Sequence, residues 1–213
     1  ASALWTRKKN EITNDQYREF YQHVSHGFDE PWEIIHVRAE GRLEYTVLLF
    51  VPGSKPIDLF QPDRKCSIRL YVRRVFVTDE CKGILPPYLR FIRGIIDTED
   101  ISLNVSREML QQDPVLLKIG SAVTKRILSG LEKSSKKSPD SYKKFWENFG
   151  PVLKEGLYED TERRDQLLRL ARFYSTHSED LVSLDEYVSR LADGQDSIYT
   201  IAGDDLAKLR SSP

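Results

Sequence analysis

Two extended runs that are apolar on both alternating faces constrain the fold of this chain more than any other feature. They span residues 42–51 and 68–77 and are rich in Val, Ile, Tyr and Phe, which favour β-strands. A strand that is apolar on both faces belongs to a sheet covered on both sides, and helices are the usual covers. The sequence therefore predicts an α/β fold of the mixed α+β kind, with helices on both faces of a sheet.

Helical patterns that can supply these covers lie on either side of the two runs. Thr13 and Gln16 form a capping box, in which each side chain accepts a hydrogen bond from the other residue's backbone amide, ahead of an amphipathic segment at residues 14–25. Asp113 and Pro114 provide a cap and a first-turn proline for a long helix. We expect one helix at residues 14–25 and another that starts near residue 114.

The most linker-like stretch is residues 134–141, which is rich in Lys and Ser and contains a proline. We place a boundary between two lobes near it. The second lobe is expected to be mixed as well: Ser183 and Glu186 form another capping box, and residues 198–201 are expected to form a short buried strand.

Opposite charges nearly cancel, with 32 Lys and Arg against 33 Asp and Glu. No field of one sign would therefore attract the whole molecule to nucleic acid or to an anionic membrane. No apolar run is long enough to span a membrane, and the first residues lack the apolar core of a signal peptide, so we expect a soluble protein. Cys66 and Cys81 match no common zinc spacing and indicate a reducing compartment, with a disulfide between them as the minor alternative.

Arginines alternate with aromatic residues in one of the extended runs, where Arg69, Arg73 and Arg74 lie close to Tyr71 and Phe76. Such a pattern also occurs on surfaces that bind nucleic acid. The balanced charge favours the other interpretation, in which these arginines pair with acidic residues at the ends of the sheet. We therefore expect no nucleic-acid partner.

The sequence lacks the motifs that build a complete active site, such as a phosphate-binding loop, a dinucleotide glycine fingerprint or a nucleophile elbow. Its four histidines have no spacing typical of zinc ligands, so no metal site is expected. The polar loop at residues 97–112 is more informative, because it runs from a buried strand into a helix start, where sites in mixed sheets are built. Arg107 and Gln111 lie one helical turn apart there, a spacing that is also typical of exposed or capping residues.

Two stretches of the sequence are long enough to be specific to one protein family. Residues 70–76 read Leu-Tyr-Val-Arg-Arg-Val-Phe, and residues 103–112 read Leu-Asn-Val-Ser-Arg-Glu-Met-Leu-Gln-Gln. With further similarity along essentially the whole chain, the sequence resembles the middle segment of the ninety-kilodalton heat-shock chaperone family, of the bacterial high-temperature protein G type. The resemblance implies a larger α-β-α layered lobe at residues 1–133, a helical connector at 134–165 and a smaller α-β-α lobe at 166–213.

The resemblance also implies a part in ATP hydrolysis. In this family an N-terminal domain binds ATP with Mg²⁺, a C-terminal domain forms a homodimer, and a loop of the middle segment, here residues 97–112, contacts the ATP through an arginine. That arginine corresponds to Arg107, Gln111 matches its polar partner, and Asn104 lies in the same loop. This segment alone is therefore expected to bind no cofactor and to be no enzyme. The alternative is a binding module with no part in hydrolysis.

Three aromatic residues correspond to contact positions of the family. Phe76 matches an apolar residue used where the N-terminal and middle domains meet, or it is plain core. Phe28 stands where many members have a Trp implicated in contacts with non-native client proteins, and Trp32 is the nearby substitute. The expected partners are the two other domains, client proteins and a second copy of the full-length chain. The expected location is the bacterial cytoplasm or an organelle matrix.

Overall fold

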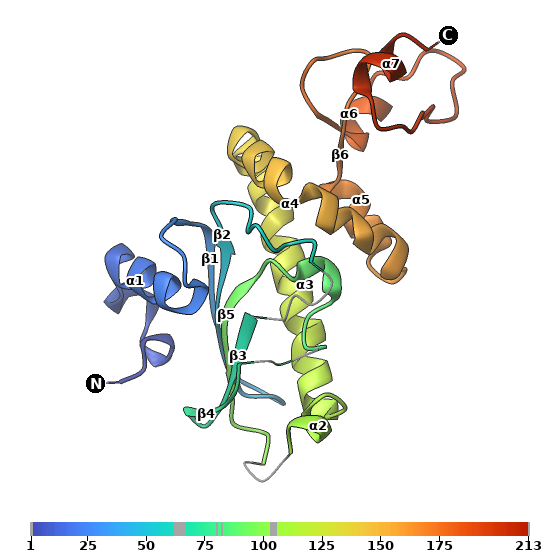
Figure 1. Cartoon of the computed structure of the whole chain (residues 1–213). Helices are drawn as coiled ribbons and strands as arrows, with labels where there is room; N and C mark the ends of the chain where they lie inside the picture. The colour runs from blue at the N-terminus through green and yellow to red at the C-terminus, as the bar shows by residue number, and fades with distance from the viewer. Residues whose placement is uncertain (1, 62–66, 80, 82, 103–105, 213) are drawn as a thin grey trace.

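A five-stranded sheet forms the centre of the computed structural model, which describes residues 2–61, 67–79, 81, 83–102 and 106–212 (Figure 1). The strands are β1 (Pro31–Ala39), β2 (Tyr45–Pro52), β3 (Ser67–Val72), β4 (Val75–Thr78) and β5 (Arg93–Thr98). Their order across the sheet is β1-β2-β5-β3-β4. β3 and β5 are parallel, and the other neighbours are antiparallel.

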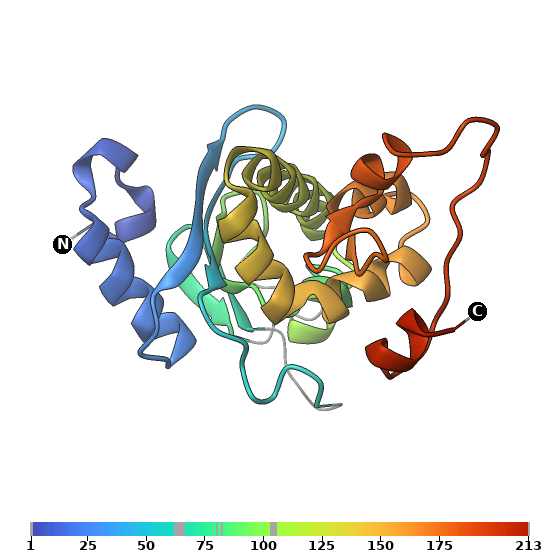
Figure 2. The same cartoon turned by 90° about the horizontal axis from the view of Figure 1, so that it is seen from above.

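Helices cover both faces of this sheet. On β2, Val47, Leu49 and Val51 point into one hydrophobic core, and Leu48 and Phe50 point into a second core on the opposite face. The first core is closed by α3 (Pro114–Lys137) and α4 (Pro139–Glu159), and the second by α1 (Asn14–Ser25), as Figure 2 shows from above. The predicted sheet between helical layers, and with it the fold class, is confirmed.

The helix starts expected from the sequence are also confirmed. In the capping box of α1, Thr13 Oγ1 accepts from the Gln16 amide at 3.2 Å, and Gln16 Oε1 accepts from the Thr13 amide at 3.0 Å. Asp113 Oδ1 caps α3 by accepting from the amides of Val115 and Leu116. These interactions are local in sequence, so the sequence alone specifies them.

The run at residues 68–77 is not one strand, and this expectation was wrong. It is a hairpin of β3 and β4 joined by Arg73 and Arg74, whose φ angles of 50° and 67° place both residues in the left-handed region. Tight two-residue hairpins require this conformation, which costs a residue with a side chain about 1–2 kcal/mol and normally selects Asn or Gly. An Arg-Arg pair gives no such signal.

The stretch at residues 134–141 is helical rather than linker-like, because α3 ends at Lys137 and α4 begins at Pro139. Side chains of α4, among them Tyr142, Phe145 and Phe149, pack into the same core as the sheet. The core therefore continues across the expected boundary, and the division into lobes at residues 133 and 165 stays a prediction.

The strand expected at residues 198–201 is absent from the described chain, and these residues are exposed, so that expectation was wrong. No described strand lies beside them to pair with their backbone. The short elements are η1 (Leu4–Thr6), η2 (Lys9–Glu11), η3 (Pro87–Leu89), α2 (Arg107–Leu110), α5 (Arg164–Leu170), β6 (Arg172–Phe173), β7 (Val182–Ser183), α6 (Leu184–Val188) and α7 (Leu206–Arg210).

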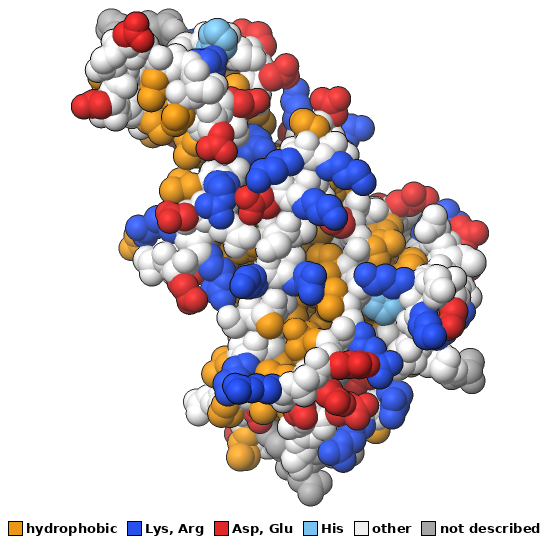
Figure 3. All heavy atoms as spheres, turned by 180° about the vertical axis from the view of Figure 1, so that it is seen from behind, with side chains coloured by type: hydrophobic (Ala, Val, Ile, Leu, Met, Phe, Trp, Pro, Cys, Tyr) orange, Lys and Arg blue, Asp and Glu red, His pale blue; other side chains and the backbone are white. Residues whose placement is uncertain are grey.

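The surface carries charges of both signs. On the face seen from behind in Figure 3, Lys and Arg side chains flank an apolar strip, with Asp and Glu interspersed. The near-equal totals of 32 basic and 33 acidic residues agree with this mixture.

His36 lies in β1 and is buried against α1 and η1. Its Nδ1 lies 2.7 Å from the Tyr17 hydroxyl, and its Nε2 lies 2.9 Å from the Trp5 carbonyl oxygen. A carbonyl only accepts, so Nε2 carries the proton and Nδ1 accepts from Tyr17. Burial lowers the pKa of His36 and nearby Lys9 adds to this, while the hydrogen bond to Trp5 opposes it.

Acidification is therefore expected to destabilise the fold through His36. Because its pKa is lowered in the folded state, the unfolded chain binds more protons below about pH 6.5, and the free energy of unfolding falls as the pH decreases through that value. Denaturant unfolding at about pH 7.5 and pH 5.5 should show a loss of up to roughly 1 kcal/mol that is smaller in His36→Gln. An identical pH dependence in the two proteins would contradict this.

Candidate functional site

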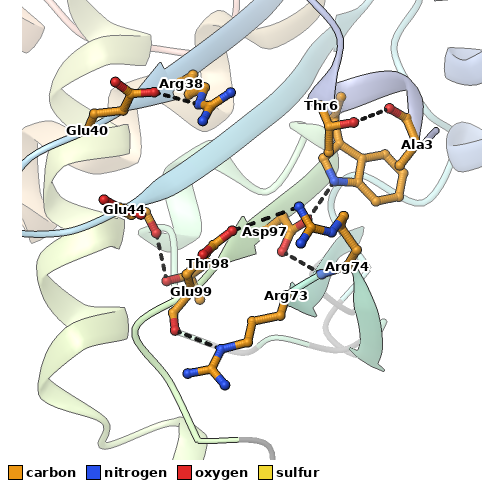
Figure 4. A network of polar contacts seen from close by, with 11 residues as sticks. Ala3, Thr6, Arg38, Glu40, Glu44, Arg73, Arg74, Asp97, Thr98 and Glu99 are labelled. Atoms are coloured by element: carbon orange, nitrogen blue, oxygen red, sulfur yellow. Dashed lines mark hydrogen bonds and ion pairs between the residues drawn. The ribbon is translucent and has the colours of Figure 1, made fainter.

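The candidate site begins at the end of β5, where Asp97 is buried with 7% of its surface exposed. Its Oδ2 accepts a hydrogen bond from Trp5 Nε1 at 2.8 Å, and its Oδ1 accepts from the backbone amide of Arg74 at 3.1 Å (Figure 4). One carboxylate thus joins three segments that are distant in sequence: η1, the β3–β4 turn and the strand that leads into the loop at residues 97–112.

The first residues of this loop are fixed against the start of β2. The backbone oxygen of Glu44 accepts from the Glu99 amide at 3.1 Å and from Thr98 Oγ1 at 3.2 Å. The Glu44 amide in turn donates to Asp100 Oδ2 at 2.6 Å. The loop therefore leaves the sheet in one defined direction.

The two arginines of the β3–β4 turn pair with the same loop. Arg73 Nε donates to the Glu99 carbonyl oxygen at 3.3 Å, and Arg74 Nη1 lies 3.9 Å from Glu99 Oε1 (Figure 4). Both partners of the ion pair are more than half exposed, so it contributes less than about 1 kcal/mol. The expected pairing with an acidic side chain is therefore seen for Arg74 alone, since Arg73 contacts a backbone carbonyl and Arg69 Nη1 lies 3.3 Å from His23 Nε2.

The far end of the loop is a capped helix start. Ser106 Oγ accepts from the Met109 amide at 3.3 Å, and Arg107 is the first residue of α2. α2 ends before Gln111, which is exposed but keeps helical backbone angles, so it remains one turn beyond Arg107. Asn104 lies outside the described residues, as does the side chain of Arg107.

The three aromatic residues that correspond to contact positions of the chaperone family differ in how much of their surface is exposed. Phe76 on β4 is 49% exposed and touches Tyr71 edge to face, with the ring centroids 5.7 Å apart, so it is not a core residue. Phe28 precedes β1 and is 97% exposed. Trp32 instead stacks on Phe145 of α4 at 4.8 Å and donates to Ser141, which gives its ring a packing role.

Sequence reasoning did not single out Trp5 and Asp97 as site residues. The two residues are 92 positions apart, and no local pattern shows that they form a hydrogen bond. A buried acidic residue at the end of an apolar strand is the only sequence signal, since such a group needs a partner.

The described residues fit only part of a nucleotide site. They contain no group of three His, Cys, Asp or Glu that could hold a metal ion. By residue type, Arg107 at the start of α2 and Gln111 just beyond its end are one cation and one amide, and both can donate hydrogen bonds to an anion. No helix in the described part of the chain is both long and apolar enough to cross a bilayer.

Comparisons with known proteins place the whole chain in one group. Residues 1–213 match a family model described as Hsp90 protein. The chain is 61% identical to the chaperone protein HtpG of Paramagnetospirillum magneticum and 55% identical to that of Roseobacter denitrificans, over its full length but over only 34% of theirs. The solved middle domain of a heat shock protein from Plasmodium falciparum matches 99% of this chain and 86% of that chain, with a TM-score of 0.86 and 28% identity.

Proposed function

Because this chain belongs to the Hsp90 family, we propose that it is the middle segment of an ATP-dependent chaperone and supplies Arg107 to ATP bound by an N-terminal domain. One observation carries the proposal: the loop that leads to Arg107 leaves a buried strand in a direction fixed by hydrogen bonds and ends in a capped helical turn. Supports of this kind at the two described ends of the loop would help to position a guanidinium.

The proposed chemistry is stabilisation of charge. Hydrolysis of the terminal phosphate spreads negative charge over its oxygens, and Mg²⁺ bound with ATP neutralises part of it. Arg107 would donate its planar fork of N–H groups to those oxygens, where an ammonium would act only as a point charge. Gln111, one turn away, would hydrogen-bond toward the same phosphate. Asn104 would be a further nucleotide contact from the same loop.

Domain docking would complete this site. Val75 and Phe76 are both about half exposed on β4, the strand that follows the turn bound to Asp97. We propose that they contact the N-terminal domain when it closes over the loop. Arg107 would then reach the phosphate only in the closed state, which would link hydrolysis to domain arrangement.

Client proteins are a second proposed partner, supported by the nearly complete exposure of Phe28. The packing of Trp32 against α4 supports a structural role for that ring instead. The full-length protein would also have a C-terminal domain that forms the homodimer. The competing hypothesis is a binding module in which the loop at residues 97–112 has no part in hydrolysis.

This chain alone is expected to bind ATP with a dissociation constant no better than about 1 mM, because an arginine and a glutamine offer too few contacts to offset the cost of ordering the ligand. Calorimetry measures the affinity, and turnover assays with and without the N-terminal domain measure the activity. Micromolar binding or turnover by this chain alone would contradict the proposal. Turnover that needs the second domain but not Arg107 would support the binding module.

A further inference from the structure

Trp5 contacts both the loop at residues 97–112 and the β3–β4 hairpin. Its indole N–H donates to Asp97, and its ring centroid lies 4.7 Å from that of Tyr71 on β3. Tyr71 in turn contacts Phe76 on β4 at 5.7 Å. Trp5 is buried, and its backbone carbonyl oxygen accepts a hydrogen bond from His36. The residue is therefore held through both its backbone and its ring.

The turn of this hairpin depends on Asp97. Arg73 and Arg74 both have positive φ angles, a conformation that residues with side chains keep only when their surroundings hold it. Asp97 Oδ1 accepts the amide hydrogen of Arg74, and Asp97 Oδ2 is bound by Trp5. The Arg73 amide also donates to the Thr98 carbonyl oxygen at 3.0 Å, so the turn rests on the end of β5.

We propose that Trp5 is a positioning residue that, by holding Asp97, fixes the β3–β4 turn and so sets how Phe76 is presented beside the loop that carries Arg107. The inference rests on the proposed function, because Phe76 and Arg107 matter together only if an N-terminal ATPase domain docks here. In that arrangement η1 follows the ATPase domain along the chain. A movement of that domain would therefore reach the hairpin through the contacts that Trp5 makes with Asp97 and Tyr71.

A residue needed only for packing would behave differently. In Trp5→Phe an aromatic ring still occupies the space beside Tyr71, but the hydrogen bond to Asp97 is lost. Trp32→Phe is the matched control, because it also removes an indole hydrogen bond, to Ser141, next to α4 and away from the hairpin. The two variants separate the loss of an indole N–H from the loss of this particular contact.

The first test is hydrogen exchange of the full-length chaperone. Exchange of the Arg74 amide is expected to be on the order of tenfold faster in Trp5→Phe than in the wild type, and unchanged in Trp32→Phe and along β2. Trypsin should also cleave after Arg73 or Arg74 faster in Trp5→Phe than in the wild type, by a factor similar to that for exchange. If the hairpin exchanges equally in both variants, the proposal is wrong.

The second test is the steady-state kinetics of ATP hydrolysis. Trp5→Phe is expected to lower kcat on the order of tenfold with an unchanged KM for ATP, whereas Trp32→Phe should change neither. Faster hairpin exchange with a normal kcat would overturn the positioning role. Full turnover in Arg107→Ala would overturn the proposed function instead, so the two failures are distinguishable.

Asp97→Asn keeps the test decisive if Trp5→Phe fails to fold. The asparagine side chain has nearly the same size as aspartate but only one acceptor oxygen, and its NH₂ group faces either Trp5 or Arg74. One of the two hydrogen bonds to Asp97 is therefore lost. We expect the same increase in exchange at Arg74. Unchanged exchange in this variant would also contradict the proposal.

Discussion

Replacing Arg107 with Ala in the full-length chaperone is expected to lower ATP turnover by roughly tenfold to a thousandfold, with little change in the nucleotide affinity of the open state. The loss is large because a guanidinium in a site that excludes water stabilises charge that develops only during hydrolysis. Arg107→Lys should recover part of the rate, since an ammonium keeps the charge but not the planar fork. Steady-state turnover and nucleotide titration of each variant measure these effects.

A matched control comes from α3, where Arg126 is exposed and has no proposed role. Arg126→Ala removes the same charge and should leave turnover unchanged. Melting temperatures of the same proteins separate the proposed role from a structural one. An Arg107→Ala protein that melts early but hydrolyses ATP at the normal rate would end the claim for Arg107.

Gly94→Ala is expected to destabilise the fold by at least about 4 kcal/mol, a large part of the stability of an ordinary domain. Gly94 lies in β5 with a φ of 133°, and a Cβ added there would be 2.1 Å from the Leu48 carbonyl oxygen. β5 is hydrogen-bonded on one side to β2 and on the other to β3, so its backbone has no room to shift. Denaturant unfolding followed by circular dichroism measures the change.

Gly41→Ala is the control for backbone strain alone. Gly41 has a similar φ of 149°, but nothing lies within 4 Å of an added Cβ. Its substitution should therefore cost only about 1–3 kcal/mol. Equal losses at the two glycines would mean that the close approach to Leu48 is unimportant.

The sequence predicts those features of the fold that are determined by residues close to one another in the chain. The start of α1 follows from Thr13 and Gln16, which lie within one helical turn of each other. The covered sheet follows from apolar residues on both faces of β2, a pattern that is complete within eight residues. Such features need no knowledge of distant contacts.

Features that depend on distant partners were missed or misjudged. The Arg73-Arg74 turn is held by Asp97, so the pair adopts a conformation that its own residue types disfavour. Residues 198–201 have the composition of a buried strand, but none of the strands in the described part of the chain pairs with them. The role proposed for Arg107 came from resemblance to a family, because one arginine and one glutamine at a helix start do not define a site.

The packing of α4 on the sheet has a consequence for synthesis on the ribosome. The face of β2 that carries Leu49 and Val51 is covered by side chains that include Phe145 and Phe149, almost a hundred positions later. At about 5–20 residues per second, that apolar face would stay uncovered for roughly 5–20 s after β2 emerges. During this interval the growing chain exposes the kind of surface that chaperones bind, so this segment would itself be a candidate client of the cell's chaperones while it is being made.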